Sequence, residues 1–362
     1  MTGNIAGSRR VTPASVEVFV YHEPETRDDG MHAHLAEETV LEDLLERCRS
    51  LFGLDVRQAE PIRRGWLHLK WKLDTSSGPF LLKMYNPERL RKHNHTDLLQ
   101  ALSLQNRLQT AGLPCPELLA AGDDMIHTSS GGEKFIVMSF CEGSLVTPGQ
   151  GSSDQLYDLG RVTGRMHRLL DVYAPSAAGA ESVPQFIPPG REERLAYWSD
   201  LLRQVQQSGS AESIPFIVRQ IETSRMIDLG PLSACERGYA HRDLWADNLL
   251  FGADRVGAVL DFDRMKSDYP ELDISRALMS LALDENGLDP DRAAAFLEGY
   301  RNERHYPRGA LVRSLRMSGW MESVWWIRGG PPPDDGPSAR FAAEVDWLAV
   351  HDRELSDRFG HL

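Results

Sequence analysis

The chain has 362 residues, more than a single hydrophobic core usually serves, so we expect two subdomains. Its net charge of −13 argues against a nucleic-acid partner, and no apolar run approaches the ~20 residues of a membrane span. The N-terminus has no signal-peptide core, and four scattered cysteines lack metal-ligand spacing, which together predict a cytoplasmic protein with reduced thiols.

The first part of the chain predicts an arm, a helix and a β-hairpin. Residues 1–34 have little periodicity and are expected to form a mobile arm. Residues 37–51 repeat apolar positions at helical spacing. Strict alternation in residues 65–73 predicts a half-buried strand, and a turn leads into a second apolar strand over residues 80–85. The first strand carries Leu67, Leu69, Trp71 and Leu73 on one face and His68, Lys70 and Lys72 on the other.

A helix and two more strands complete a small lobe. Apolar side chains recur at helical spacing over about residues 96–111, and Gly112 is the expected stop of this helix. Strands are predicted near residues 118–127 and 134–140, on either side of a Ser-Ser-Gly-Gly turn. This β-β-α-β-β order predicts that residues 35–140 form one small lobe.

Residues 141–362 predict a larger, mainly helical lobe. Ser153 or Asp154 is expected to cap a helix that runs to about Asp171, and Asp289-Pro290 opens another. Further helices are predicted over residues 191–207, 214–229, 311–328 and 339–350. The expected fold class is α+β, with a small antiparallel sheet and one helix in the first lobe and mainly helices in the second.

The segment that runs from Tyr239 to Phe251 carries the strongest chemical signal. Asp243 lies five residues before Asn248, and Asn248 lies thirteen before Asp261, with apolar runs around each. Phosphoryl transfer uses one carboxylate to align the acceptor hydroxyl, and an amide and a second carboxylate to hold Mg²⁺. A lone His-Arg-Asp is usually a turn, but the full spacing favours a base at Asp243 and metal ligands at Asn248 and Asp261.

Three other charged residues belong to this pattern. Lys83 shares a strand face with Leu81, and a buried ammonium is costly unless anions such as nucleotide phosphates meet it. The alternative is a lysine on a solvent face. Asp263 is expected on the strand face opposite Asp261 if the strand continues, either supporting the metal ligands or binding a second metal. Asp247 is expected to be a solvated turn residue.

Together, Lys83, His241-Arg-Asp243, Asn248 and Asp261 resemble the aminoglycoside phosphotransferase and choline kinase superfamily. The likeness runs over about residues 63–281 and is nearest to the spore-coat-protein-like and type II homoserine kinase-like branches. It implies a bilobal fold like that of protein kinases, with ATP and Mg²⁺ as cofactors and a small-molecule hydroxyl as acceptor.

The resemblance also implies roles for residues outside the catalytic segment. The Ser139 carbonyl and the Cys141 amide would bind the adenine edge at an interlobe hinge, with Met138 packed behind it. Backbone amides around Gly65 would cover the phosphates, although this segment is not a glycine-rich loop. Asp273 would brace the catalytic loop through backbone N–H groups.

The small-lobe helix departs from the family pattern. Where the glutamate partner of Lys83 is expected, this chain has Ala101. Two possibilities stay open, and in the first of them Lys83 relies on nucleotide phosphates alone. Gln100, Gln105 or Glu88 as a substitute partner is the alternative, and a carboxylate within ~4 Å of its ammonium would contradict the first version.

Three functions are compatible with these residues. The first is an ATP- and Mg²⁺-dependent kinase that acts on a small-molecule hydroxyl, and the retained catalytic residues favour it. The second is a kinase-fold binding protein with weak or no catalysis. A protein kinase is disfavoured because the glycine-rich loop and the Ala-Pro-Glu segment are absent.

The acceptor is less well specified by the sequence. Large-lobe helices carry an aromatic and acidic set that suits a cationic or sugar-like compound such as an aminoglycoside. Homoserine and amino alcohols remain open, and the alternative is that these tryptophans pack in the core. The set is Trp198, Trp320, Trp325, Trp326, Trp347 and Glu322.

Overall fold

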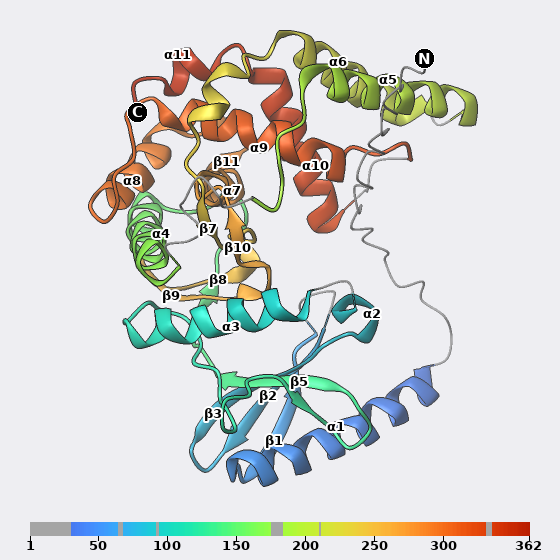
Figure 1. Cartoon of the computed structure of the whole chain (residues 1–362), viewed down its shortest axis with the longest axis vertical. Coiled ribbons are helices and arrows are strands. Elements are labelled where there is room, and N and C mark those ends of the chain that lie inside the picture. The colour runs from blue at the N-terminus through green and yellow to red at the C-terminus, as the bar shows by residue number, and fades with distance from the viewer. Residues whose placement is uncertain (1–29, 64–67, 92–93, 175–183, 210, 331–334) are drawn as a thin grey trace, which may run out of the picture.

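The computed structural model describes residues 30–63, 68–91, 94–174, 184–209, 211–330 and 335–362, with side chains described from residue 38 onward (Figure 1). A small lobe built on an antiparallel sheet lies at one end of the molecule, and a larger, mainly helical lobe lies at the other. The expected bilobal α+β fold is confirmed. None of the described helices is both long and apolar enough to cross a membrane.

The small lobe contains a five-stranded sheet in the order β1-β2-β3-β5-β4, with every neighbouring pair antiparallel. The predicted hairpin is confirmed, but β1 was missed because Val-Arg-Gln-Ala-Glu-Pro has no apolar alternation. The strand predicted near residues 118–127 is reduced to an isolated bridge from Leu118 to Met138 and a short β4. The strands are β1 (Val56–Pro61), β2 (Leu69–Thr75), β3 (Gly78–Met84), β4 (His127–Thr128) and β5 (Lys134–Ser139).

The two faces of this sheet pack against different helices. Trp71 and Leu73 of β2, with Leu82 of β3, are buried against α1 (Gly30–Phe52). The opposite face is covered by α3 (His95–Thr110), which lies between the sheet and the large lobe in Figure 1. Because side chains alternate along a strand, the residues next to Trp71 on β2 lie on the opposite face of the sheet, which is turned toward the large lobe. Helix α1 begins at Gly30, so the predicted arm extends too far, and residues 1–29 lie outside the described part.

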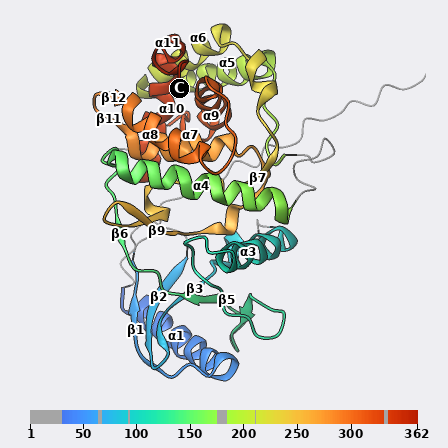
Figure 2. The same cartoon turned by 90° about the vertical axis from the view of Figure 1, so that its left-hand side faces the viewer.

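The large lobe is organised around the close packing of two helices, α4 (Ser153–Tyr173) and α8 (Pro290–Arg301). Gly160 of α4 and Gly299 of α8 lie at their crossing, where a Cβ would collide with the backbone carbonyl of the facing helix. Figure 2 shows α4 between the other large-lobe helices and the small lobe. Its N-cap is Ser152, in a capping box with Gln155, one residue before the predicted cap.

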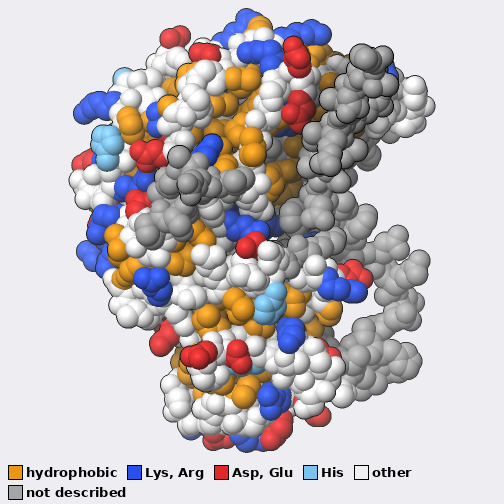
Figure 3. All heavy atoms as spheres, in the orientation of Figure 1, with side chains coloured by type: hydrophobic (Ala, Val, Ile, Leu, Met, Phe, Trp, Pro, Cys, Tyr) orange, Lys and Arg blue, Asp and Glu red, His pale blue; other side chains and the backbone are white. Residues whose placement is uncertain are grey.

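Four of the other large-lobe helices are close to their predicted ranges, and two, one of them only five residues long, were not predicted. Helix α7 was not predicted, because all twelve of its residues are buried and it has no solvent face to mark. The set is α5 (Arg191–Ser208), α6 (Ile214–Met226), α7 (Glu271–Ala282), α9 (Ala310–Trp326), α10 (Gly336–His351) and α11 (Leu355–Phe359). Figure 3 shows acidic and basic side chains interspersed on both lobes, without one large acidic patch on this face.

Candidate active site

The catalytic segment lies between two small sheets of the large lobe. Strand β7 (Gly238–Ala240) pairs with β10 (Lys266–Asp268), and β8 (Leu249–Gly252) pairs with β6 (Ser144–Leu145) and β9 (Arg255–Val259). The loop between β7 and β8 therefore has both ends fixed. It contains Asp243 and Asn248, and the loop after β9 contains Asp261.

The turn before Asp243 is held by Asp273, as expected. Arg242 has a φ of 66°, in the left-handed region that a non-glycine residue seldom adopts. The Asp273 carboxylate accepts hydrogen bonds from the backbone N–H groups of His241, at 2.6 Å, and Arg242, at 2.8 Å. Burial raises the pKa of Asp273, but His167 and the backbone donors outweigh it and hold the pKa below its usual value. The anionic carboxylate thus stabilises the strained turn.

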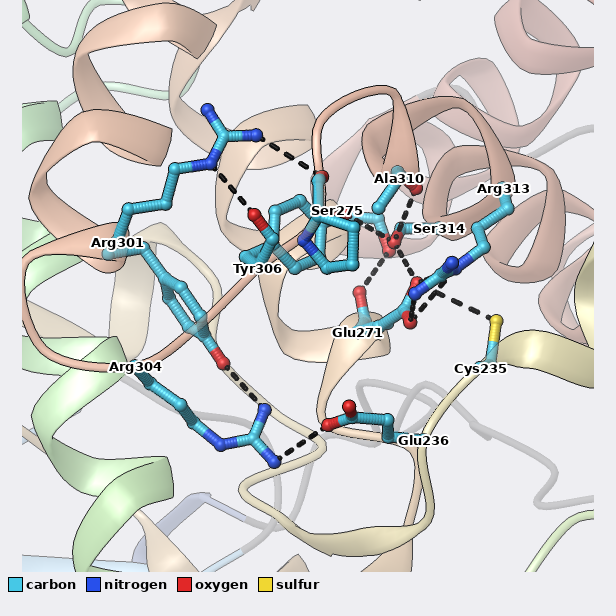
Figure 4. Close-up of polar contacts among 12 residues, drawn as sticks. Cys235, Glu236, Glu271, Ser275, Arg301, Arg304, Tyr306, Ala310, Arg313 and Ser314 are labelled. Atoms are coloured by element: carbon cyan, nitrogen blue, oxygen red, sulfur yellow. Dashed lines mark hydrogen bonds and ion pairs between the residues drawn. The ribbon is translucent and has the colours of Figure 1, made fainter.

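Helix α7 is itself held from three sides. His167 of α4 contacts Asp273 through Nε2 at 3.0 Å, while its Nδ1 contacts the Tyr300 hydroxyl of α8 at 2.9 Å. At the start of α7, the Glu271 carboxylate accepts hydrogen bonds from Arg313 and Ser314 of α9 (Figure 4). The packing of the large-lobe helices therefore sets the position of the catalytic turn.

Asp243 and Asn248 are in direct contact. The Asn248 side-chain amide donates to Oδ2 of Asp243 and to its backbone carbonyl, both at 2.9 Å. The other carboxylate oxygen, Oδ1, lies 3.8 Å from a guanidinium nitrogen of Arg264. Since the Asp243 side chain also lines a cavity, this arrangement can orient a hydroxyl group and accept its proton.

Lys83 has carboxylate partners, so the possibility that it relies on phosphates alone is wrong. Lys83 is buried, and only 3% of its surface is exposed. Its ammonium nitrogen lies 2.9 Å from a carboxylate oxygen of Asp261 and 2.7 Å from one of Asp263. Burial lowers the pKa of Lys83, but the two carboxylates outweigh it and raise the pKa well above its usual value. Of the proposed substitutes, Gln105 donates instead to the Pro116 carbonyl, and no ion pair within the described part of the chain joins Glu88 to Lys83.

The backbone after β9 explains why both aspartates reach Lys83. Asp261 has a φ of 60°, and a short 3-10 helix, Phe262–Arg264, follows it. The strand therefore ends before Asp261, and the expectation that Asp263 points to the opposite strand face is wrong. Residues two apart would share a face even on a continuing strand. Asp263 also accepts a hydrogen bond from the Tyr85 hydroxyl at 3.3 Å, which ties it to the small lobe.

A cavity of about 1170 Å³ lies between the lobes and contains the predicted site. Asp247 also lines it as a half-buried residue rather than a solvated one. Gly65 lies outside the described residues. The predicted residues that line the cavity are Lys83, Met138, Ser139, Cys141, Asp243, Asn248 and Asp261.

The hinge residues lie at the end of β5. Met138 is buried and pairs with Leu81 of β3, and both line the cavity. The Ser139 hydroxyl accepts a hydrogen bond from the backbone N–H of Glu117 at 2.9 Å, which holds its side chain against the segment before β4. The binding of adenine by backbone atoms of Ser139 and Cys141 stays a prediction.

Sequence reasoning missed Lys70 as a site residue, although the alternation of β2 placed it on the correct face. Lys70 lines the cavity and pairs with Lys83 in the β2–β3 register. Burial lowers the pKa of Lys70, partly offset by the charge of Asp261. Two lysines therefore face the cavity from neighbouring strands.

The donor atoms of Asn248 and Asp261 fit a divalent cation. Asn248 uses its amide nitrogen on Asp243, so its side-chain oxygen is the atom left for a metal. The Asp261 side chain is 28% exposed, which leaves its carboxylate accessible from the cavity. No group of three or more His, Cys, Asp or Glu residues in the described part of the chain forms a metal site. Phosphate oxygens and water would have to complete the coordination, as is usual for Mg²⁺.

The predicted acceptor wall is only partly correct. Trp325 and Trp326 line the cavity, but Trp198 and Trp320 are buried in the helix-packing core and Trp347 stacks on His351. Glu322 is paired with Arg276 and does not reach the cavity. The residues that replace them at the wall are Phe216, Trp245 and Phe341, with the acids Glu212, Asp247 and Asp335 and the base Arg328.

Comparison with known proteins agrees with this geometry. The profile of the “Phosphotransferase enzyme family” matches residues 58–312. The homoserine kinase of Sinorhizobium fredii is 28% identical over 244 residues, which cover 67% of this chain and 69% of that protein.

Solved structures share the fold. Amicoumacin kinase hAmiN, in complex with AMP-PNP and Ca²⁺, is 14% identical, with a TM-score of 0.56 over 88% of this chain and 96% of that one. A microcompartment-associated aminopropanol kinase is 15% identical, with a TM-score of 0.55 over 88% of this chain and 98% of that one. At these identities the likeness establishes the fold alone.

Proposed function

Because the chain belongs to the phosphotransferase enzyme family, whose members transfer phosphate to hydroxyl acceptors, we propose that its donor is ATP with Mg²⁺ and its acceptor a small hydroxyl compound that carries an amino group. The family resemblance expected from the sequence is confirmed. The donor, the metal and the class of acceptor are the parts that we propose.

The observation that carries this proposal is the position of Asp243. Asn248 holds one oxygen of its carboxylate, the carboxylate lines the cavity, and Lys83 and Asp261 line the same cavity. Asp243 would orient the acceptor hydroxyl and take its proton late, because phosphoryl transfer proceeds through a loose transition state.

Asn248 and Asp261 would hold Mg²⁺, which when bound neutralises charge on the phosphate oxygens. The chain's own contribution is to exclude water and fix geometry. Met138 and Leu81 form an apolar floor at the hinge side of the cavity, where a flat base could pack. Lys83 keeps Asp261 and Asp263 in place before any nucleotide arrives.

The wall of the large-lobe part of the cavity supports an amino-bearing acceptor. Aromatic faces attract an ammonium group, and the carboxylates of Glu212, Asp247 and Asp335 outnumber the two arginines, Arg264 and Arg328, of the large-lobe lining. Homoserine and aminopropanol, the substrates named for two similar proteins, both combine a hydroxyl and an amino group. An aminoglycoside combines the same groups on a larger scaffold and belongs to the same proposed class.

An acceptor panel tests this proposal. ATP consumption and phosphate-ester formation would be measured with homoserine, 1-amino-2-propanol and an aminoglycoside. Each small acceptor is matched by its analogue without the amino group, 4-hydroxybutyrate or 2-propanol. We expect ester formation with an amino-bearing acceptor and at least ~10-fold slower reaction with the analogue, the scale expected for one buried ionic contact. Equal rates for a matched pair would contradict the amino requirement.

A kinase-fold binding protein is the second candidate, and the two aspartates paired with Lys83 favour it. In the nucleotide-free protein the two carboxylates engage two of the three donors of this ammonium, which leaves only one donor for a phosphate. Tight Mg·ATP binding with no ester from any acceptor would support this candidate and contradict the kinase.

A further inference from the structure

We propose that Lys70 is a second phosphate-binding lysine of the nucleotide site, acting beside Lys83. This inference rests on the proposed function, because it assumes that a nucleotide occupies the cavity. The sequence pattern predicts phosphate binding for Lys83 of β3 alone, and this proposal adds Lys70 of β2.

The register of the sheet places Lys70 at the site. Lys70 and Lys83 are direct Cα partners in the antiparallel β2–β3 pair, and both line the cavity. The flanking residue Trp71 is buried on the other face of β2, against α1. Because a strand alternates strictly, Lys70 cannot leave the cavity face without pulling Trp71 out of the core.

The two lysines differ in their partners. Lys83 is paired with Asp261 and Asp263. By contrast, no described residue places a carboxylate oxygen within 4.0 Å of the Lys70 ammonium. Lys83 has two of its three donors engaged by carboxylates and one left for a phosphate, whereas Lys70 has all three available.

The pair of like charges needs an anion. Cations directly opposite each other on one sheet face repel, and the two aspartates supply just enough charge to balance the two lysines. A divalent cation at Asp261 would add positive charge beside them. The polyanionic phosphate chain of a nucleotide then supplies the missing negative charge, and Lys70 is the cation positioned to receive it.

An alternative is that Lys70 is only a solvated lysine at the cavity mouth. In that case its charge would matter neither for nucleotide affinity nor for stability. The two versions are separated by removing the charge while keeping the length of the side chain, which Lys70→Met does.

Binding of Mg·ATP and of adenosine would be measured by calorimetry for wild type, Lys70→Met, Lys70→Arg and a control, Lys134→Met. Lys134 belongs to the same sheet but lies outside the cavity lining, where its ammonium donates to the Thr128 hydroxyl at 2.7 Å. We expect Lys70→Met to weaken Mg·ATP about 10- to 100-fold, the loss usual for a charged contact. Adenosine binding should be unchanged, and Lys70→Arg should recover most of the Mg·ATP affinity.

The melting temperature without ligand gives a second readout. Lys70→Met should not lower it, and we expect a small rise, because the substitution removes a partly desolvated charge opposite Lys83. Mg·ATP affinity within about twofold of wild type, or an equal loss for Mg·ATP and adenosine, would overturn the proposal. Wild-type protein that binds no Mg·ATP would instead overturn the proposed function, a result distinct from either.

Discussion

Two ion clusters in this protein have the same arrangement of charges but differ in whether they open to the interlobe cavity. The cleft cluster consists of Lys83, Asp261 and Asp263, and the core cluster consists of Arg276, Glu322 and Glu344. Each has one cation between two carboxylates. The cleft cluster lines the interlobe cavity, with the Asp261 side chain 28% exposed, whereas no side chain of the core cluster exceeds 9% exposure and none lines the cavity.

The choice of cation follows the setting. The guanidinium of Arg276 is a planar fork that binds Glu322 and Glu344 through separate nitrogens and stays charged at all times. The ammonium of Lys83 is a compact charge that can exchange one partner for another. We infer that an enclosed cluster serves stability, while a cluster that opens into a cavity can exchange a carboxylate for a ligand.

The largest effect is expected for a substitution of Asp243, whose carboxylate lines the same cavity as the cleft cluster. Asp243→Asn should lower kcat about 10²- to 10⁴-fold, because it removes the group that orients the hydroxyl and takes its proton. Mg·ATP affinity and melting temperature should stay close to wild type, since Asp243 pairs with neither lysine. Steady-state kinetics and calorimetry measure both. A rate within about tenfold of wild type would remove Asp243 from the mechanism.

The core cluster should respond in the opposite way. Arg276→Met leaves Glu322 and Glu344 buried without their shared partner and should lower the free energy of unfolding by about 3–5 kcal/mol. The folded fraction should retain the wild-type KM for ATP. Arg203→Met, which breaks an exposed pair with Asp200, is the matched control and should cost less than about 1 kcal/mol. A loss in Arg276→Met no larger than this control would refute the structural assignment.

The stabilisation that bound Mg·ATP gives the protein provides a further test of the cleft cluster. Mg·ATP at 100 times its Kd should add about 2.7 kcal/mol to the free energy of unfolding of wild type. Asp261→Ala should lose this gain, because a metal ligand is removed, and a thermal melt with and without Mg·ATP measures it. Asp254→Ala, at an exposed turn, should keep it. Full stabilisation of Asp261→Ala would exclude Asp261 as a metal ligand.

The smallest expected effect concerns pH. Burial raises the pKa of Asp268 from 3.8 to about 6, although Arg242 at 2.7 Å acts in the opposite direction. A group with a raised folded-state pKa stabilises the fold below its unfolded pKa and loses that contribution as the pH rises through about 6. The free energy of unfolding of Asp268→Asn, taken relative to that of wild type, should therefore rise by on the order of 1 kcal/mol between about pH 5 and about pH 7.5.

Asp273→Asn should show the opposite dependence of the free energy of unfolding on pH. It would be measured in the same denaturation series as Asp268→Asn. The folded-state pKa of Asp273 is lowered, so its contribution is present above the unfolded pKa and is lost as the pH falls. The difference between this variant and wild type should shrink in acid. Parallel pH profiles for the two variants would show that neither carboxyl has the assigned environment.

The spacing of residues along the sequence predicted much of the site, but it did not predict which side chains pair with one another there. The catalytic spacing identified Asp243, Asn248 and Asp261, which the structure brings to one cavity, although their catalytic roles stay predictions. The partners of Lys83 lie 178 and 180 residues away along the chain. No local pattern reports such a contact, because it depends on where the chain turns after β9.

The same division holds for the helices. Helix α5 is predicted within one residue because it has a solvent face, while α7 is buried on every side and escaped detection. Trp198 and Trp325 both lie on predicted helices, yet one packs in the core and the other lines the cavity.

The small-lobe hairpin, most of the helices and the spacing of the phosphoryl-transfer residues could all be predicted from local sequence patterns. These features depend on residues close in the chain, through alternation, helical periodicity and caps. Three other features follow from how the elements pack: Asp261 and Asp263 pair with Lys83, Glu322 pairs with Arg276, and Lys70 faces the cavity without a carboxylate partner among the described residues. Those outcomes depend on distances between charges carried by different elements, which are set when the lobes and helices pack.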